Sequence, residues 1–184
     1  MKLESSFLIG ENIYLKPTER TDLEHFQKWT NDSEVRKLIG EVTPMNEKDL
    51  DAYYERLTQD KSRIWFTIVL KKDNRIIGET GLLRMFHLWR NTDLSIILGE
   101  KDTWGKGYGT EAIMLLLDYA FGYLNFHRVS IGVVGFNNKA LKFYEKIGFK
   151  KEGIQRDGYY YDHKYHDFVM MSILENEFRA LYKD

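Results

Sequence analysis

The sequence predicts a single α/β domain of the α+β kind, in which a mixed, mostly antiparallel sheet of about seven strands packs against about four helices. Three strand-like runs follow one another at residues 63–70, 75–85 and 92–98, which is typical of an antiparallel meander. A glycine-rich turn and a helical run separate the third of them from a strand at 128–134, which indicates a crossover connection. No linker rich in Pro, Gly or Ser divides the chain, so we expect one domain over residues 1–184.

The N-terminal third predicts one strand and two helices. Residues 12–16 alternate between polar and apolar side chains, as a half-buried strand does. Residues 18–29 and 46–60 each carry apolar side chains at helical spacing, and Asn46 is placed to cap the second helix. The meander follows, with its first turn at residues 72–74.

The C-terminal half predicts two helices and three strands. Residues 111–124 carry an apolar stripe at helical spacing, and 128–134 are rich in β-branched residues. A further helix begins at Asn137, a favourable cap, and ends at Gly148. Two late strands complete the order, at residues 149–158 and 165–174.

The segment from Trp104 to Thr110 contains Gly105, Gly107 and Gly109 and lies between a strand and a helix. Glycines allow a ligand to approach the main chain, and the unpaired N–H groups of a first helical turn attract anions. The spacing fits neither a P-loop nor the dinucleotide fingerprint, which argues against a nucleotide-binding Rossmann domain. We therefore expect another ligand that carries phosphates.

The composition narrows the class of protein. The formal net charge of −1 gives no general attraction to nucleic acid, and no apolar segment approaches the roughly 20 residues that span a bilayer. The absence of Cys excludes a disulfide framework, a thiolate zinc site and a cysteine nucleophile. We expect a cytoplasmic enzyme or binding domain without a nucleic-acid or membrane partner.

Two motifs in this order resemble the GNAT superfamily of acetyl-CoA-dependent N-acetyltransferases. The first, Gln/Arg-x-x-Gly-x-Gly/Ala, is matched by Gly107 and Gly109, with Trp104 in place of the Gln or Arg. The second, Asn-x-x-Ala-x-x-x-Tyr followed by Gly-Phe, is matched by Asn137, Ala140, Tyr144, Gly148 and Phe149. Residues 29–35, 104–112 and 161–167 look like the subgroup that contains the ribosomal-protein N-terminal acetyltransferases and the spermidine acetyltransferases.

This resemblance implies a GNAT-type domain whose sheet splays between the fourth and fifth strands, with acetyl-CoA as the donor and no metal. The pyrophosphate would bind the amides of the glycine loop, and the pantetheine arm would run beside the strand that ends at Leu98. The implied donor-binding residues are Ile96, Ile97, Leu98, Trp104, Gly105, Lys106, Gly107, Tyr108, Gly109, Thr110, Asn137, Lys139 and Tyr144.

The chemistry follows in part from the residues themselves. Without Cys, we expect the acceptor amine to attack the thioester directly. Tyr144 is the candidate general acid, although its place on an apolar stripe also fits a core tyrosine with a satisfied hydroxyl. The candidate bases are Asp93, which we prefer, then Glu79, with Glu100 also near the central strands.

The acceptor stays open among a peptide N-terminus, a polyamine and another small amine. Six acidic residues between positions 41 and 60 favour either a cation-binding face or a solvated helix, and the tyrosines at 159–165 either wall the acceptor site or alternate on a hairpin. His163 and His166 lie in a polar turn that only weakly resembles a metal site. A homodimer is plausible, and the rival hypothesis is a non-catalytic acetyl-CoA-binding or sensor domain.

Overall fold

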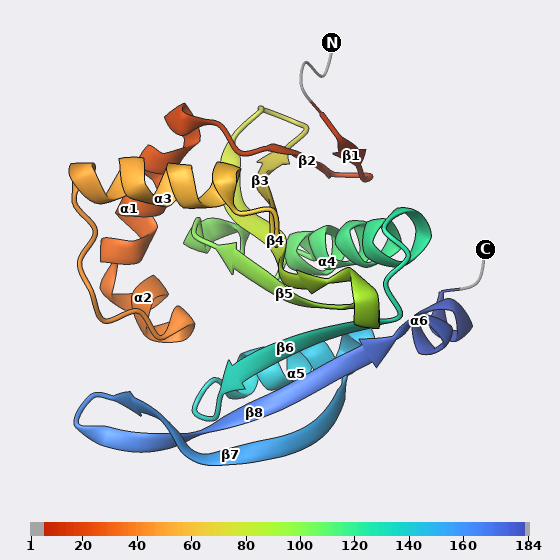
Figure 1. The fold of residues 1–184 in the computed structure, drawn as a ribbon. Helices are drawn as coiled ribbons and strands as arrows, with labels where there is room; N and C mark the ends of the chain where they lie inside the picture. The colour runs from red at the N-terminus through yellow and green to blue at the C-terminus, as the bar shows by residue number, and fades with distance from the viewer. Residues whose placement is uncertain (1–5, 183–184) are drawn as a thin grey trace.

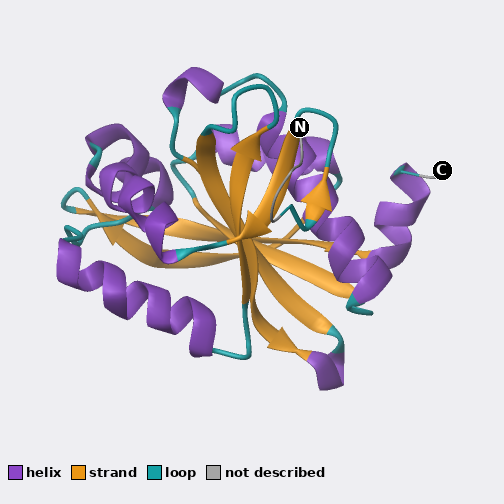
Figure 2. Ribbon diagram, turned by 90° about the horizontal axis from the view of Figure 1, so that it is seen from above, coloured by secondary structure: helices purple, strands orange, loops and turns teal. Residues whose placement is uncertain are grey.

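One sheet of eight strands runs through the structure, and helices lie on both sides of it (Figures 1 and 2). The computed structural model describes residues 6–182, so both ends of the domain expected over residues 1–184 lie outside the described part. The strands are β1 (Leu8–Ile9), β2 (Ile13–Pro17), β3 (Ile64–Leu70), β4 (Ile76–Phe86), β5 (Asn91–Leu98), β6 (Arg128–Val134), β7 (Lys150–Tyr161) and β8 (Lys164–Leu174). The helices are α1 (Leu23–Asn31), α2 (Ser33–Ile39), α3 (Glu47–Gln59), α4 (Tyr108–Asp118), α5 (Asn138–Ile147) and α6 (Glu175–Leu181). Across the sheet the strand order is β1-β2-β3-β4-β5-β6-β8-β7.

Two apolar cores are separated by the sheet, because successive side chains of a strand point to opposite faces. On β3, Phe66 and Ile68 belong to the larger core, which also contains the buried side chains of α4 and α5. Trp65, which directly precedes Phe66 and so points to the opposite face, packs against the smaller core, which is built from α1, α2 and α3. The three early helices therefore cover one face of the sheet, and α4 and α5 cover the other.

Strands β5 and β6 run parallel but stay together only briefly. Residues 91–93 of β5 pair with residues 128–130 of β6. Beyond these pairs, β5 continues to Leu98 and β6 to Val134 without further pairing between them (Figure 1). This confirms the splay expected between the fourth and fifth predicted strands.

The predicted strands and helices are all present. Residues 128–134 form β6 as expected, and Asn46 caps α3 by accepting hydrogen bonds from the backbone N–H groups of Lys48 and Asp49. Helix α5 begins after Asn137 and ends at Gly148, whose φ of 111° is favourable only for glycine. The polar turn at residues 72–74 joins β3 to β4.

Among the strands and α-helices of the described residues, three were not predicted from the sequence: β1, α2 and α6. Helix α2 lies between the two predicted early helices, and Asp32 caps it by accepting from the N–H groups of Glu34 and Val35. It has only 7 residues, too few for an apolar period to stand out. The same shortness hid β1 and α6, which have 2 and 7 residues.

Two helix starts also differ from the prediction. Helix α1 begins at Leu23 and not at residue 18, because a 3-10 turn (Arg20–Asp22) precedes it. Helix α4 begins at Tyr108, three residues before the predicted start, because Gly107 turns the chain into the helix without a side-chain cap. No helix within residues 6–182 is both long and apolar enough to cross a membrane.

Leu116 on α4 is fully buried against the sheet, so Leu116→Ala should lower the free energy of unfolding by about 2 to 5 kcal/mol. Chemical denaturation monitored by circular dichroism measures this loss. Asp118→Ala, at an exposed position of the same helix, is the control and should change stability by less than about 0.5 kcal/mol. A loss below about 1 kcal/mol for Leu116→Ala would mean that α4 does not pack as described.

Candidate active site

The glycine loop forms a cradle of free backbone amides. Gly105 and Gly107 have φ angles of 74° and 88°, and nothing lies within 4 Å of the place where their side chains would begin. The N–H groups of residues 105–110 find no hydrogen-bond acceptor within residues 6–182; the first paired amide of α4 is that of Glu111, which donates to the Gly107 carbonyl over 3.0 Å. Six consecutive unpaired N–H groups at a helix N-terminus are suited to bind an anion with several oxygens.

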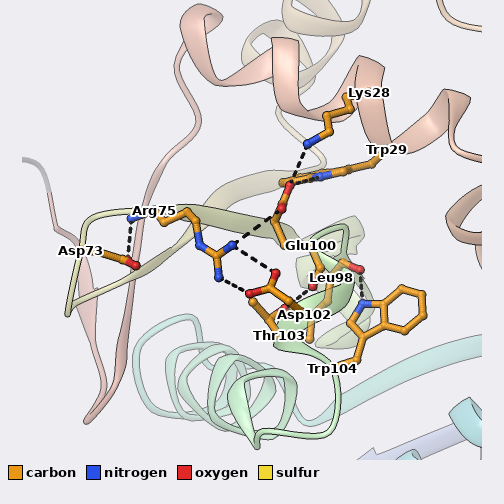
Figure 3. Close-up of polar contacts among 9 residues, drawn as sticks. All are labelled: Lys28, Trp29, Asp73, Arg75, Leu98, Glu100, Asp102, Thr103 and Trp104. Carbon is orange, nitrogen blue, oxygen red and sulfur yellow. Dashed lines mark hydrogen bonds and ion pairs between the residues drawn. The ribbon is translucent and has the colours of Figure 1, made fainter.

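The loop is fixed to the end of β5. The Trp104 indole N–H donates to the Leu98 carbonyl over 2.8 Å, as Figure 3 shows. Behind the loop, Gly109 lies against the side chains of Leu98 and Phe143, where a Cβ would be within 3.4 Å of both. Tryptophan at the position where the family carries Gln or Arg therefore has a positioning contact of its own.

The other predicted donor-binding side chains are exposed or half-buried. The side chains of Lys106, Thr110 and Lys139 are exposed and form no hydrogen bond or ion pair with another residue in the part of the chain that the structure describes. Tyr108, the first residue of α4, is half-buried. Ile96 and Ile97 are half-buried on β5, beyond its last pair with β6.

Tyr144 is buried on α5 with a free hydroxyl. Its ring packs edge-on against Phe149, and burial raises the pKa of its phenol. The hydroxyl forms no hydrogen bond with any residue from 6 to 182. Over the same residues the Arg75 Nε is the one side-chain nitrogen or oxygen that is fully enclosed and unpaired, so the Tyr144 hydroxyl must reach solvent-accessible space. This differs from a core tyrosine with a satisfied hydroxyl.

Glu79 is a buried carboxyl on the face of β4 covered by α3. It accepts hydrogen bonds from the Trp65 indole N–H over 2.7 Å and from the Tyr53 hydroxyl over 3.1 Å. Burial raises its pKa to about 7, and the two hydrogen bonds offset part of that effect. In the sheet it lies opposite Ile97, within the splayed part of β5. Glu79 is therefore a carboxyl that changes protonation near neutral pH.

The other two candidate bases are held by cations. Asp93 is opposite Ser130 in the last β5–β6 pair, before the strands part, and forms an ion pair with Arg84. Glu100 accepts a hydrogen bond from the Trp29 indole N–H over 2.9 Å and lies 3.5 Å from the Lys28 ammonium. Asp93 is thus paired with a cation of β4 and Glu100 with a cation of α1.

Asn137 connects the start of α5 to the end of α2. Its Oδ1 accepts from the Ala140 N–H over 3.1 Å, and its Nδ2 donates to the Leu38 carbonyl at the end of α2 over 3.0 Å. Tyr159 of β7 donates from its hydroxyl to the carbonyl of Gly40, the residue that follows α2. One member of the tyrosine cluster thus holds α2, whereas Tyr160 and Tyr165 remain exposed.

The histidines of the β7–β8 turn do not form a metal site with their neighbours. Within residues 6–182, no group of three or more His, Asp or Glu side chains is arranged to hold a metal ion. His166 lies with its Nε2 3.2 Å from the Tyr161 carbonyl and its ring against Phe136.

Sequence reasoning missed the partners of Glu79 and the role of Trp29. Tyr53 and Trp29 were interpreted only as apolar positions on helices, and Trp65 as a strand residue. The sequence signal that was available is their indole N–H or phenol group, which requires a partner when buried. No pattern in the sequence says which carboxylate that partner is.

Comparison with known proteins now identifies the family. Residues 12–150 match the model of the acetyltransferase (GNAT) domain family. The chain is 32% identical over 177 residues to the probable N-acetyltransferase YjcK of Bacillus subtilis, covering 91% of this chain and 96% of that protein. It is 28% identical over 174 residues to spermidine N(1)-acetyltransferase of Escherichia coli, covering 95% and 92%. The crystal structure of spermidine N-acetyltransferase from Vibrio cholerae in complex with CoA and spermine superposes with a TM-score of 0.83 at 26% identity, covering 91% and 98%. Matched motifs, splayed sheet and relatives agree, and the chain belongs to the GNAT acetyltransferase family.

Proposed function

We propose that this protein, as one domain over residues 1–184, transfers the acetyl group of acetyl-CoA to a primary amine of a small molecule. The observation that carries the proposal is the cradle of six unpaired amides at residues 105–110. A pyrophosphate supplies the several anionic oxygens that such a cradle binds. The relatives named for spermidine acetylation, and the CoA in the related Vibrio cholerae complex, support the same donor.

The splay supports a site for the rest of the donor. After Asp93, β5 has a partner strand on one side only, so alternate N–H and C=O groups of residues 94–98 face the opening. An amide-containing arm can pair with these groups as a strand would, although Trp104 already occupies the Leu98 carbonyl. Lys106 and Lys139 are free to meet the donor's outer phosphates.

For catalysis we propose Glu79 as proton acceptor and Tyr144 as proton donor. Acetyl-CoA supplies the acetyl group as a thioester, and the amine nitrogen bonds to its carbonyl carbon as the carbon–sulfur bond breaks. Glu79, directly or through water, takes the proton that the amine loses, for which a pKa near 7 is well matched. Tyr144 gives its proton to the departing sulfur, and its raised pKa keeps the phenol protonated until then. We prefer Glu79 to Asp93 because Arg84 neutralises Asp93.

For the acceptor we propose a polyamine as the first substrate to test, because relatives named for spermidine match nearly the whole chain. Peptide N-termini form the second arm of the test, since their lower pKa leaves more neutral amine at pH 7. The cytoplasmic location, the homodimer and the lack of a metal stay predictions. Light scattering on the purified protein measures the oligomeric state.

Tyr144→Phe should lower kcat by about 100-fold or more, because general acids contribute at least that much, while acetyl-CoA still binds. A free-thiol assay with spermidine, spermine, peptide N-termini, aminoglycosides and amino sugars measures turnover, and calorimetry measures binding. Tyr123→Phe, at an exposed position, is the control. If wild-type protein binds acetyl-CoA but acetylates none of the panel, the sensor hypothesis replaces the enzyme.

Glu79→Gln should remove the acidic limb of the pH–rate profile, which we expect to fall as pH drops below about 7 in the wild type. Because folding raises this pKa from 4.5 to about 7, the stabilisation that protonated Glu79 provides is complete below pH 4.5 and lost as pH rises through 7. Between pH 5 and 8 the wild type should therefore lose about 2 to 3 kcal/mol more stability than Glu79→Gln. If the pH–rate profiles of the wild type and Glu79→Gln are parallel, Glu79 is not the base. If their stability profiles are also parallel, the pKa of Glu79 is not raised by folding.

Gly107→Ala tests the amide cradle. The new methyl group meets no protein atom, so the cost to folding is the strain of a φ of 88°, roughly 1 to 2 kcal/mol. The methyl group projects into the open space in front of the loop, so the Kd for acetyl-CoA should rise at least about tenfold. Gly153→Ala, which also has open space but no positive φ, should leave that Kd unchanged. Unaltered binding in Gly107→Ala would place the phosphates elsewhere.

A further inference from the structure

Helix α1 rests directly on the stretch of chain that leads into the glycine loop. We name residues 99–104 the approach segment. At its start, Gly99 lies so close to the Trp29 indole that a Cβ at this position would overlap the ring. The same indole donates its N–H to the Glu100 carboxylate over 2.9 Å, as Figure 3 shows. One side chain of α1 therefore provides both packing and a hydrogen bond to two consecutive residues.

Charges on neighbouring elements hold the carboxylates of the approach segment. Arg75, just before β4, forms two hydrogen bonds to Asp102, of 3.1 and 2.7 Å, and its guanidinium lies 3.9 Å from Glu100 (Figure 3). Lys28 of α1 approaches Glu100 from the other side at 3.5 Å. The Glu100 side chain is only 20% exposed, so its hydrogen bond with Trp29 is better shielded from water than a surface pair.

The end of the approach segment is equally well fixed. The Thr103 hydroxyl donates to the Glu100 carbonyl, and the Trp104 indole donates to the Leu98 carbonyl. The first free amide of the cradle, at Gly105, follows Trp104 directly. A shift of Glu100 would therefore move Gly105 and the start of the cradle with it.

We propose that Trp29, acting through Glu100, is a positioning residue for the donor phosphates. Its hydrogen bond sets the path of the approach segment so that the amides of residues 105–110 converge on one anion. This inference rests on the proposed function, since it takes those amides as the pyrophosphate site. It assigns a part in donor binding to α1, which lies on the opposite face of the sheet from α4.

Trp29→Phe tests the proposal because it keeps an aromatic ring on Gly99 and removes the N–H donor. We expect the Kd for acetyl-CoA, measured by calorimetry, to rise about five- to tenfold. The kcat/KM for acetyl-CoA should also fall at least about fivefold more than that for S-acetylpantetheine, which lacks the phosphates. A general loss of structure would lower both donors alike, and equal losses would overturn the proposal.

Two further variants sharpen the result. Glu100→Leu removes the acceptor of the same hydrogen bond, so it should reproduce the loss, and the double variant should bind acetyl-CoA no more weakly than the weaker single variant. Trp89→Phe is the matched control, because it removes the indole N–H of an exposed tryptophan outside the approach segment, and it should change the Kd by less than about twofold. Additive losses from Trp29→Phe and Glu100→Leu would contradict a shared contact. If the wild type itself does not bind acetyl-CoA, the proposed function fails; if it binds and Trp29→Phe binds equally well, only this inference fails.

Discussion

The parting of β5 and β6 is the constraint on which the rest of the site depends. A sheet interior normally satisfies every backbone N–H and C=O, and here the pairing stops after residues 93 and 130. The groups beyond must find water, side chains or a ligand. Trp104 satisfies the Leu98 carbonyl, and the glycine loop leaves its own amides open beside it. Because both sets of free groups lie at the same end of β5, one extended ligand can satisfy them together.

The two proposed catalytic groups share one electrostatic cause. Burial favours the neutral form of both Glu79 and Tyr144, and it therefore raises both pKa values. The results differ because their ordinary values differ. Glu79 is brought to the middle of the physiological range, where it can exchange a proton, whereas Tyr144 is kept firmly protonated. A single physical effect thus prepares one group to accept a proton and another to donate one.

The sequence predicted best those elements whose ends are marked by the preferences of one or a few neighbouring residues. Asn46, Asn137 and Gly148 mark helix ends through their own backbone and side-chain preferences, so α3 and α5 were predicted closely. Helix α2 was missed because its 7 residues are held by a cap and by hydrogen bonds to its C-terminal end from Asn137 and Tyr159, which are far away in the sequence. The splay came from the resemblance to a family, since no local pattern in β5 or β6 announces where their pairing ends.

The residues of the candidate site can be divided in the same way, into those that local sequence predicts and those that only the structure identifies. The glycine loop was recognisable because three alternating glycines before a helix indicate a turn that only glycine adopts easily. Choosing among Glu79, Asp93 and Glu100 required knowing which of them faces a cation, and the ion pair of Asp93 with Arg84 joins residues on two strands. Tyr144 was named from the motif, but only the structure shows that its hydroxyl has no partner within residues 6–182.

The two hydrogen bonds onto the end of α2 bear on how such a protein can change over evolutionary time. Asn137 and Tyr159 donate hydrogen bonds to main-chain carbonyls, those of Leu38 and Gly40. Main-chain atoms are the same whatever side chains α2 carries. The helix can therefore exchange its outward side chains, and the loop after it can vary in length, while its docking on the sheet is conserved.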